Sequence, residues 1–194
     1  YEQSIQWYRQ ALELDPSVAV EVHEQIGLMY VAWNKPEKAV DAFRNAIQAH
    51  DEGEGRRTAS GSVHRNLGLV RGRMDKLKEG KEQLAKAVEA SRIELDENPN
   101  SVVTWEQLGD TSAALGDFKG ASDAFDKAAT LEPRNPSHYQ KLARALEFQR
   151  RYDEAVAVVG KHIKLMQEQG RRDLVAQLSQ YIEVLKYNKV KHAK

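Results

Sequence analysis

The sequence predicts an all-α protein, a right-handed α-solenoid of antiparallel helix pairs that ends in a carboxyl-terminal capping helix. One pattern of apolar and small residues recurs along the chain at steps of 34 or 41 residues. Each recurrence holds two amphipathic helical runs joined by a short polar turn. Only 5 prolines and 12 glycines occur among the 194 residues, which is sparse for a β-rich chain. Because a lone helix pair cannot bury its apolar face, the pairs are expected to stack.

The pattern is most complete in residues 102–135, which carry in order Trp105, Leu108, Gly109, Gly116, Phe118, Ala121, Phe125, Ala128 and Pro133. The equivalent of Gly109 is Ala143 in the next repeat, and it is Gly68 and then Gly27 in the two repeats before. Residues 1–18 fit the second half of one more repeat. Since the first helix of that repeat is missing, we expect the chain to be a fragment of a longer protein.

The two steps of 41 residues each leave a surplus over the ordinary step of 34. In the earlier repeat the surplus predicts a polar loop from His50 to Arg57, because this stretch contains glycines and has no periodicity. In the later repeat it predicts two extra turns of the second helix, since the apolar period continues to Leu95. The predicted repeats therefore span residues 1–18, 19–60, 61–101, 102–135 and 136–170.

Residues 171–194 leave the pattern and are predicted to form a capping helix with a basic tail. One apolar stripe extends over about four turns and consists of Leu174, Val175, Leu178, Tyr181, Ile182 and Leu185. A stripe of this kind suits a helix that covers the open end of the last repeat. The lysines of the tail are Lys186, Lys189, Lys191 and Lys194.

These repeats resemble the tetratricopeptide repeat. That family has an aromatic residue at position 4, Leu-Gly at 7 and 8, Ala at 20, an aromatic residue at 24, Ala at 27 and Pro at 32. Residues 102–135 match nearly every one of these positions, and the other repeats match more loosely. The resemblance implies a solenoid of helix–turn–helix units that binds proteins or peptides on its concave face.

Two groups of residues are predicted to set the packing. The first is a set of small residues that lets the two helices of a pair approach closely, with Gly27, Gly68, Gly109 and Ala143 facing Ala39, Gly80, Ala121 and Ala155. The second is a set of core aromatic residues that fills the space against the neighbouring repeat, namely Tyr30, Phe43, Trp105, Phe125 and Tyr139.

Composition excludes several classes of function. The 29 basic and 29 acidic side chains balance, which argues against binding to nucleic acid by overall charge. No apolar run approaches the roughly 20 residues of a membrane helix, so membrane insertion is not expected. The chain has no cysteine, which excludes disulfides and cysteine-based zinc sites. The predicted protein is soluble, and both cytoplasm and periplasm remain open.

Motifs for catalysis are missing as well. His23 and Glu24 begin like a zinc-protease motif, but Gly27 stands where the second histidine would be. The six histidines are scattered, and no phosphate-binding glycine loop follows an apolar strand. We therefore expect no enzyme activity of this chain, no cofactor and no metal.

The resemblance places the ligand site on first-helix positions of successive repeats. The predicted peptide-binding residues are Gln25, Arg65, Asn66, Leu69, Arg73, Glu106, Gln107, Asp110, Lys141 and Arg144. The carboxylate clamp of some family members is not expected, because Glu24 and Leu28 occupy its first positions. Three amides in register (Gln25, Asn66 and Gln107) form a candidate ladder for a peptide backbone, interrupted at Lys141. The alternative is that they are ordinary solvated helix positions.

These observations favour a protein–protein interaction scaffold with a protein or peptide partner. Net charge is −4 over residues 1–60, −3 over 61–133 and +7 over 134–194. The basic end suits an acidic partner or the acidic end of another copy in a homo-oligomer; lysines that merely solubilise an end helix give the same distribution. Two alternatives stay open: a self-assembling structural scaffold, and the recognition domain of a longer enzyme such as a glycosyltransferase.

Overall fold

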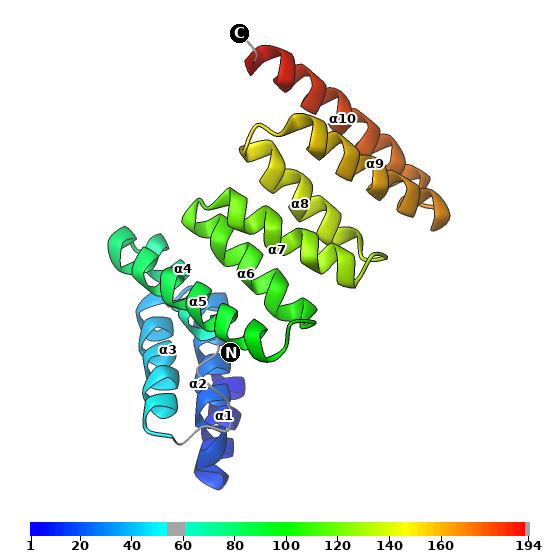
Figure 1. The fold of residues 1–194 in the computed structure, drawn as a ribbon. Coiled ribbons are helices and arrows are strands. Elements are labelled where there is room, and N and C mark those ends of the chain that lie inside the picture. The colour runs from blue at the N-terminus through cyan, green and yellow to red at the C-terminus, as the bar shows by residue number, and fades with distance from the viewer. Residues whose placement is uncertain (54–60, 193–194) are drawn as a thin grey trace. The chain divides into compact units, whose positions relative to one another are not determined.

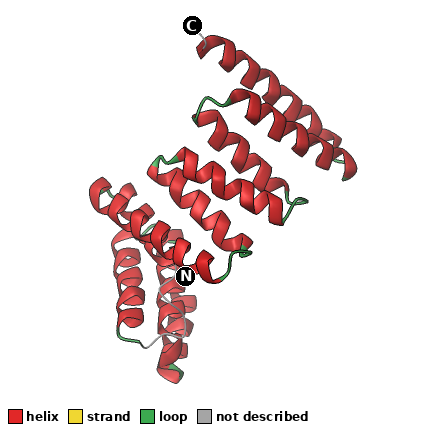
Figure 2. Cartoon of the chain, in the orientation of Figure 1, coloured by secondary structure: helices red, strands yellow, loops and turns green. Residues whose placement is uncertain are grey.

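A computed structural model describes residues 1–53 and 61–192 (Figure 1). The chain divides into two compact units, an amino-terminal unit over Tyr1–Ile93 and a carboxyl-terminal unit over Glu94–Lys194. Within the described ranges the secondary structure consists of ten α-helices and one short 3-10 helix, with no strand (Figure 2). The predicted all-α fold of paired helices is confirmed.

The amino-terminal unit contains α1 (Glu2–Leu14), η1 (Pro16–Val18), α2 (Ala19–Ala32), α3 (Pro36–Asp51), α4 (Gly61–Arg73) and most of α5 (Leu77–Glu97). Helix α1 packs on α2, α2 packs on α3, and α3 packs on α4. Their apolar faces form one core around Phe43 and Val63, neither of which is exposed. The turn between α2 and α3 passes through Asn34 in the left-handed region (φ 56°), after which Pro36 begins α3.

The surplus residues of the two longer repeats lie in different places. Helix α5 has 21 residues against 14 in α7, as the prediction of extra turns requires. The predicted loop of residues 50–57 needs a correction at its start, because α3 continues through His50 and Asp51. The helical period of α3 thus extends beyond its last apolar residue, and residues 54–57 of that predicted loop lie outside the described part of the chain.

The carboxyl-terminal unit contains α6 (Val102–Leu115), α7 (Phe118–Leu131), α8 (Pro136–Phe148), α9 (Tyr152–Glu168) and α10 (Arg172–His192), each packed on the next. Side chains cap three of these helices. Ser101 Oγ, Asp117 Oδ1 and Asn135 Oδ1 accept hydrogen bonds from the backbone N–H groups of Thr104 (3.3 Å), Gly120 (2.9 Å) and Ser137 (3.1 Å). Gly116 ends α6 with a φ of 84°.

At two of the small residues the nearest neighbour is an aromatic ring of the paired helix. A Cβ on Gly27 would lie 2.5–2.8 Å from ring atoms of Phe43, and a Cβ on Gly109 would meet the ring of Phe125 in the same way. The prediction named the small residues Ala39 and Ala121 on the facing helices and did not include these rings. The aromatic side chain, one turn further along the second helix than the predicted alanine, reaches over the glycine.

The predicted core aromatic residues fall into two groups. Tyr30, Phe43 and Phe125 are buried, at 9%, 0% and 3% exposure. Trp105 and Tyr139 are only half-buried, so their prediction as core residues is wrong. Trp105 Nε1–H donates to the carbonyl of Pro99 (2.8 Å), and the Tyr139 hydroxyl, 34 residues later in the sequence, donates to that of Pro133 (2.9 Å). Both side chains tie the start of a first helix to the preceding loop.

Helix α10 is part of the carboxyl-terminal core, as predicted for a cap. Leu185 has no exposed surface, and Leu178, Tyr181 and Ile182 pack against the same buried cluster. Lys189 Nζ also lies 2.6 Å from the Asp153 carboxylate of α9. In the described part of the chain, no helix is long and apolar enough to cross a membrane.

Candidate functional site

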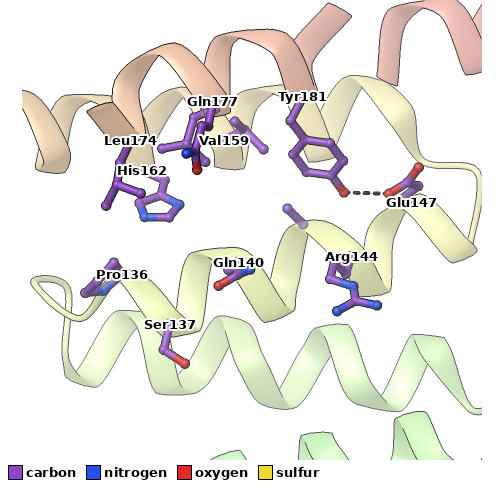
Figure 3. A pocket seen from close by; sticks show the side chains of 12 residues that line it. Pro136, Ser137, Gln140, Arg144, Glu147, Val159, His162, Leu174, Gln177 and Tyr181 are labelled. Carbon is purple, nitrogen blue, oxygen red and sulfur yellow. Dashed lines mark hydrogen bonds between the residues drawn. The ribbon is translucent and has the colours of Figure 1, made fainter. Parts of the chain in front are cut away.

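Two neighbouring hollows mark the carboxyl-terminal unit. The larger, called here the α8–α10 groove, has a volume of about 530 Å³ between α8 and α10, with α9 beneath (Figure 3). Its lining comprises Pro136, Ser137, Gln140, Ala143, Arg144 and Glu147 of α8, Val159 and His162 of α9, and Leu174, Gln177, Leu178 and Tyr181 of α10. A largely apolar hollow with a few polar groups is the usual form of a binding site.

The second hollow, called here the α6–α8 groove, has a volume of about 350 Å³. Its lining comprises Asp110 and Ala113 of α6, Phe118 and Phe125 of α7, and Lys141, Arg144, Ala145 and Phe148 of α8. The rings of Phe118 and Phe148 stack with their centroids 4.4 Å apart, and Phe148 is 61% exposed. An aromatic surface is therefore open to solvent at this groove.

Lys141 is held between two carboxylates of α6. Its Nζ lies 3.0 Å from Asp110 Oδ2 and 3.5 Å from Glu106 Oε1. Glu106 also lies 3.2 Å from Nδ1 of the fully buried His138, whose Nε2 is 3.2 Å from Glu132. Hydrogen bonds from Asn135 and His138 lower the pKa of Glu132. This polar network joins α6, the end of α7 and α8, and it compensates the charge of Lys141.

Glu147 is engaged by two side chains of α10. The Tyr181 hydroxyl donates to Glu147 Oε2 (2.5 Å), and Asn188 Nδ2–H donates to Glu147 Oε1 (3.2 Å). Burial and the neighbouring Glu147 carboxylate raise the pKa of Tyr181, so the phenol keeps its proton and remains a donor. These contacts fix one wall of the α8–α10 groove to the other, as the dashed line in Figure 3 shows for Tyr181.

Arg144 differs from these compensated charges. It is exposed, it lines both grooves, and no residue in the described ranges forms an ion pair with it. In Figure 3 its guanidinium points away from Tyr181. The grooves thus share one cation that is available to a ligand.

His162 projects from α9 into the α8–α10 groove (Figure 3). The His162 side chain is buried, with 7% of its surface exposed. Its ring stacks on that of Tyr139 at a centroid distance of 6.2 Å. Its Nε2 has no hydrogen-bond partner, and burial lowers the pKa of His162. The neutral imidazole is therefore the favoured form at neutral pH.

The predicted site residues are divided between the two units. Gln25 of α2 and Arg65, Asn66, Leu69 and Arg73 of α4 belong to the amino-terminal unit. Arg73 borders a small hollow of about 140 Å³ there. Glu106, Gln107 and Asp110 of α6 and Lys141 and Arg144 of α8 belong to the carboxyl-terminal unit. The amide ladder, which needs members from both units, stays a prediction.

Within the carboxyl-terminal unit the structure brings together three of the predicted residues. Asp110, Lys141 and Arg144 line the α6–α8 groove, and Glu106 contacts Lys141 from beside it. Gln107 lines neither groove. Sequence reasoning missed the groove residues of α10, because Leu174 and Leu178 were assigned to the capping stripe alone. It also missed the stacked pair Phe118–Phe148, whose spacing of 30 residues matches no repeat step.

The fold and the grooves define a class: an all-helical repeat protein whose first helices line one face of the carboxyl-terminal unit. The family model of the tetratricopeptide repeat matches residues 1–18 and 102–135. These are two of the segments in which the sequence predicts tetratricopeptide repeats.

Solved structures with the same fold include MamA, YrrB and the pilF protein of Pseudomonas aeruginosa. MamA has a TM-score of 0.57 and 21% identity, over 86% of this chain and 89% of its own. YrrB, described as a TPR protein with an unusual peptide-binding site, has a TM-score of 0.57 and 22% identity, over 91% and 83%. The pilF protein has a TM-score of 0.58 and 21% identity, over 100% and 90%. At these identities the likeness shows the fold alone.

One curated relative matches a short segment. A protein of Haemophilus influenzae, described as the cytochrome c-type biogenesis protein CcmH, is 41% identical over 59 residues. The match covers 30% of this chain and 13% of that protein, so the chain spans only a small part of the relative's length.

Proposed function

We propose that this chain is a non-catalytic scaffold for protein–protein interaction, which binds an extended segment of a partner protein in the two grooves of the carboxyl-terminal unit. The observation that carries the proposal is the pair of hollows that meet at Arg144. A ligand that fills both must span the width of α8, which suits a peptide better than a compact small molecule. The stacked rings of Phe118 and Phe148 supply exposed apolar surface for it.

The polar groups of the grooves support binding rather than chemistry. Lys141 and Glu147 are held by neighbouring side chains, which fixes their orientation and occupies their polar atoms with contacts inside the protein. No group of three or more metal-ligating side chains occurs in the described ranges. We assign no cofactor, metal or nucleic acid to this surface.

The test is selection of peptides on the purified chain, followed by hydrogen-exchange mass spectrometry of the complex. A phage-displayed library of random twelve-residue peptides is the probe. We expect the selected peptides to slow exchange in α6, α8 and α10 and to leave α2 and α3 unchanged.

Two variants locate the binding surface. Phe148→Ser removes an exposed ring of the α6–α8 groove and should weaken the selected peptides tenfold or more. Val190→Ser, at a residue that is 65% exposed on α10 and lines neither groove, is the matched control and should bind as the parent does. Peptides that protect α2 and α3, or that bind Phe148→Ser with unchanged affinity, would place the binding surface elsewhere.

A further inference from the structure

We infer that the two grooves select an extended segment in which one internal Asp or Glu is flanked on both sides by apolar side chains. This inference rests on the proposed function and names the chemistry of the segment. Arg144 provides the key observation, since it is the one residue that lines both hollows.

The charges that face the grooves leave a single cation available. Of the charged groups in the two linings, Lys141 is compensated by Asp110 and by the nearby Glu106. Both oxygens of Glu147 accept hydrogen bonds from α10. No described residue forms an ion pair with Arg144. Its guanidinium can therefore bind a carboxylate through two parallel hydrogen bonds, the bidentate geometry that arginine favours.

The position of Arg144 decides which carboxylate fits. A hollow opens on each side of it, one toward α6 and one toward α10. A segment whose carboxylate meets Arg144 and which fills both hollows must continue in both directions. The carboxylate therefore belongs to a side chain inside the segment and not to the carboxyl terminus.

The two hollows differ in the apolar side chain that each suits. The α6–α8 groove presents the aromatic surfaces of Phe118, Phe125 and Phe148, which favour an aromatic or long aliphatic residue. The α8–α10 groove presents Val159, Leu174 and Leu178, which favour an aliphatic residue. The hydrogen bond between Tyr181 and Glu147 fixes the two walls of the α8–α10 groove to each other before a ligand binds, which reduces the cost of ordering on binding.

The experiment uses one peptide from the selection described above, in four forms. They are the selected peptide, the peptide with its internal Asp or Glu changed to the amide, the peptide with an amidated carboxyl terminus, and the peptide with both changes. Each is titrated by fluorescence anisotropy against the full chain, against Arg144→Gln and against Arg134→Gln. Arg134 is an exposed arginine that lines neither groove, so it is the matched control.

We expect Arg144→Gln to weaken the selected peptide at least tenfold, and Arg134→Gln to leave it unchanged. The internal amide peptide should bind the parent at least tenfold more weakly, with little further loss on Arg144→Gln, because the two changes remove the same contact. Amidation of the terminus should have no effect. Binding should also weaken as salt rises for the parent and less so for Arg144→Gln.

Three results would overturn the inference. The first is a pool of selected peptides without enrichment of Asp or Glu between apolar residues. The second is that the affinity losses from the internal amide and from Arg144→Gln add in the double combination. The third is that amidation of the carboxyl terminus weakens binding while the internal amide does not. Each of these leaves the proposed function intact if Phe148→Ser still weakens binding tenfold or more. If no selected peptide protects α6, α8 and α10, the proposed function itself fails.

Discussion

Replacing Leu185 by Ala tests whether α10 is an integral part of the carboxyl-terminal unit. Leu185 has no exposed surface and packs in the cluster that contains Tyr152, Ala155 and Val159. Truncation of a leucine at such a position removes apolar contacts and leaves a cavity, at a cost of about 3–5 kcal/mol. For a unit of about 100 residues this corresponds to a fall in melting temperature of roughly 12 °C or more.

The adjacent residue is a matched control. Val184 lies on the same helix turn but is 50% exposed. Val184→Ala should change the stability by no more than about 0.5 kcal/mol, because the lost contact is small and alanine favours the helix.

The assay must separate the two units, because they need not unfold together. Thermal denaturation by circular dichroism gives the shift in melting temperature. Hydrogen-exchange mass spectrometry then locates it: Leu185→Ala should accelerate exchange in α8, α9 and α10, while peptides from α2 and α3 serve as the internal reference. If Leu185→Ala melts and exchanges as the parent does, or if Val184→Ala is equally destabilised, then α10 does not pack as described.

Two further predictions concern a glycine pair and a buried histidine. Gly109→Ala should destabilise the protein by about 1–3 kcal/mol, because the added Cβ meets the ring of Phe125. Gly160→Ala lies in the middle of α9, where the added Cβ has no described neighbour within 4 Å, and it should stabilise the protein by about 0.5–1 kcal/mol. Equal urea midpoints for the two variants would contradict this packing. Burial lowers the pKa of His162 in the folded state below its ordinary value near 6.5, so the unfolded chain binds the proton first, and stability should fall as the pH drops from about 6.5 through the folded-state pKa. Urea midpoints between pH 7.5 and 5 should fall less for His162→Leu than for the parent, and parallel profiles would show that His162 does not contribute.

Much of the local structure was predictable because its causes are local. Ser101 and Asn135 cap the helices that begin at the predicted repeat bounds 102 and 136, and Gly116, a residue of the recurring pattern, ends α6. The extra turns of α5 follow from an apolar period that continues along the sequence. The cap role of α10 was also predictable, since a stripe of apolar residues on one face of a helix needs a surface to cover.

The site was only partly predictable, because its properties depend on neighbours from other helices. Lys141 and Arg144 lie three residues apart on α8 and look equivalent in the sequence. The structure places Lys141 between two carboxylates of α6 and leaves Arg144 at the junction of two hollows. The wall that α10 supplies could not be inferred either, since its stripe both seals the core and borders the groove.

The sequence by itself thus determined the all-α class, the recurrence of helix pairs and the capping helix, because periodicity and turn chemistry act over a few residues. The tertiary structure decided which aromatic ring covers Gly27 and which covers Gly109, that Trp105 and Tyr139 bond to loops instead of filling the core, and which cation of α8 stays uncompensated. These outcomes depend on the direction and reach of side chains across helix interfaces. Residues distant in the chain set them, and the spacing within one helix does not contain that information.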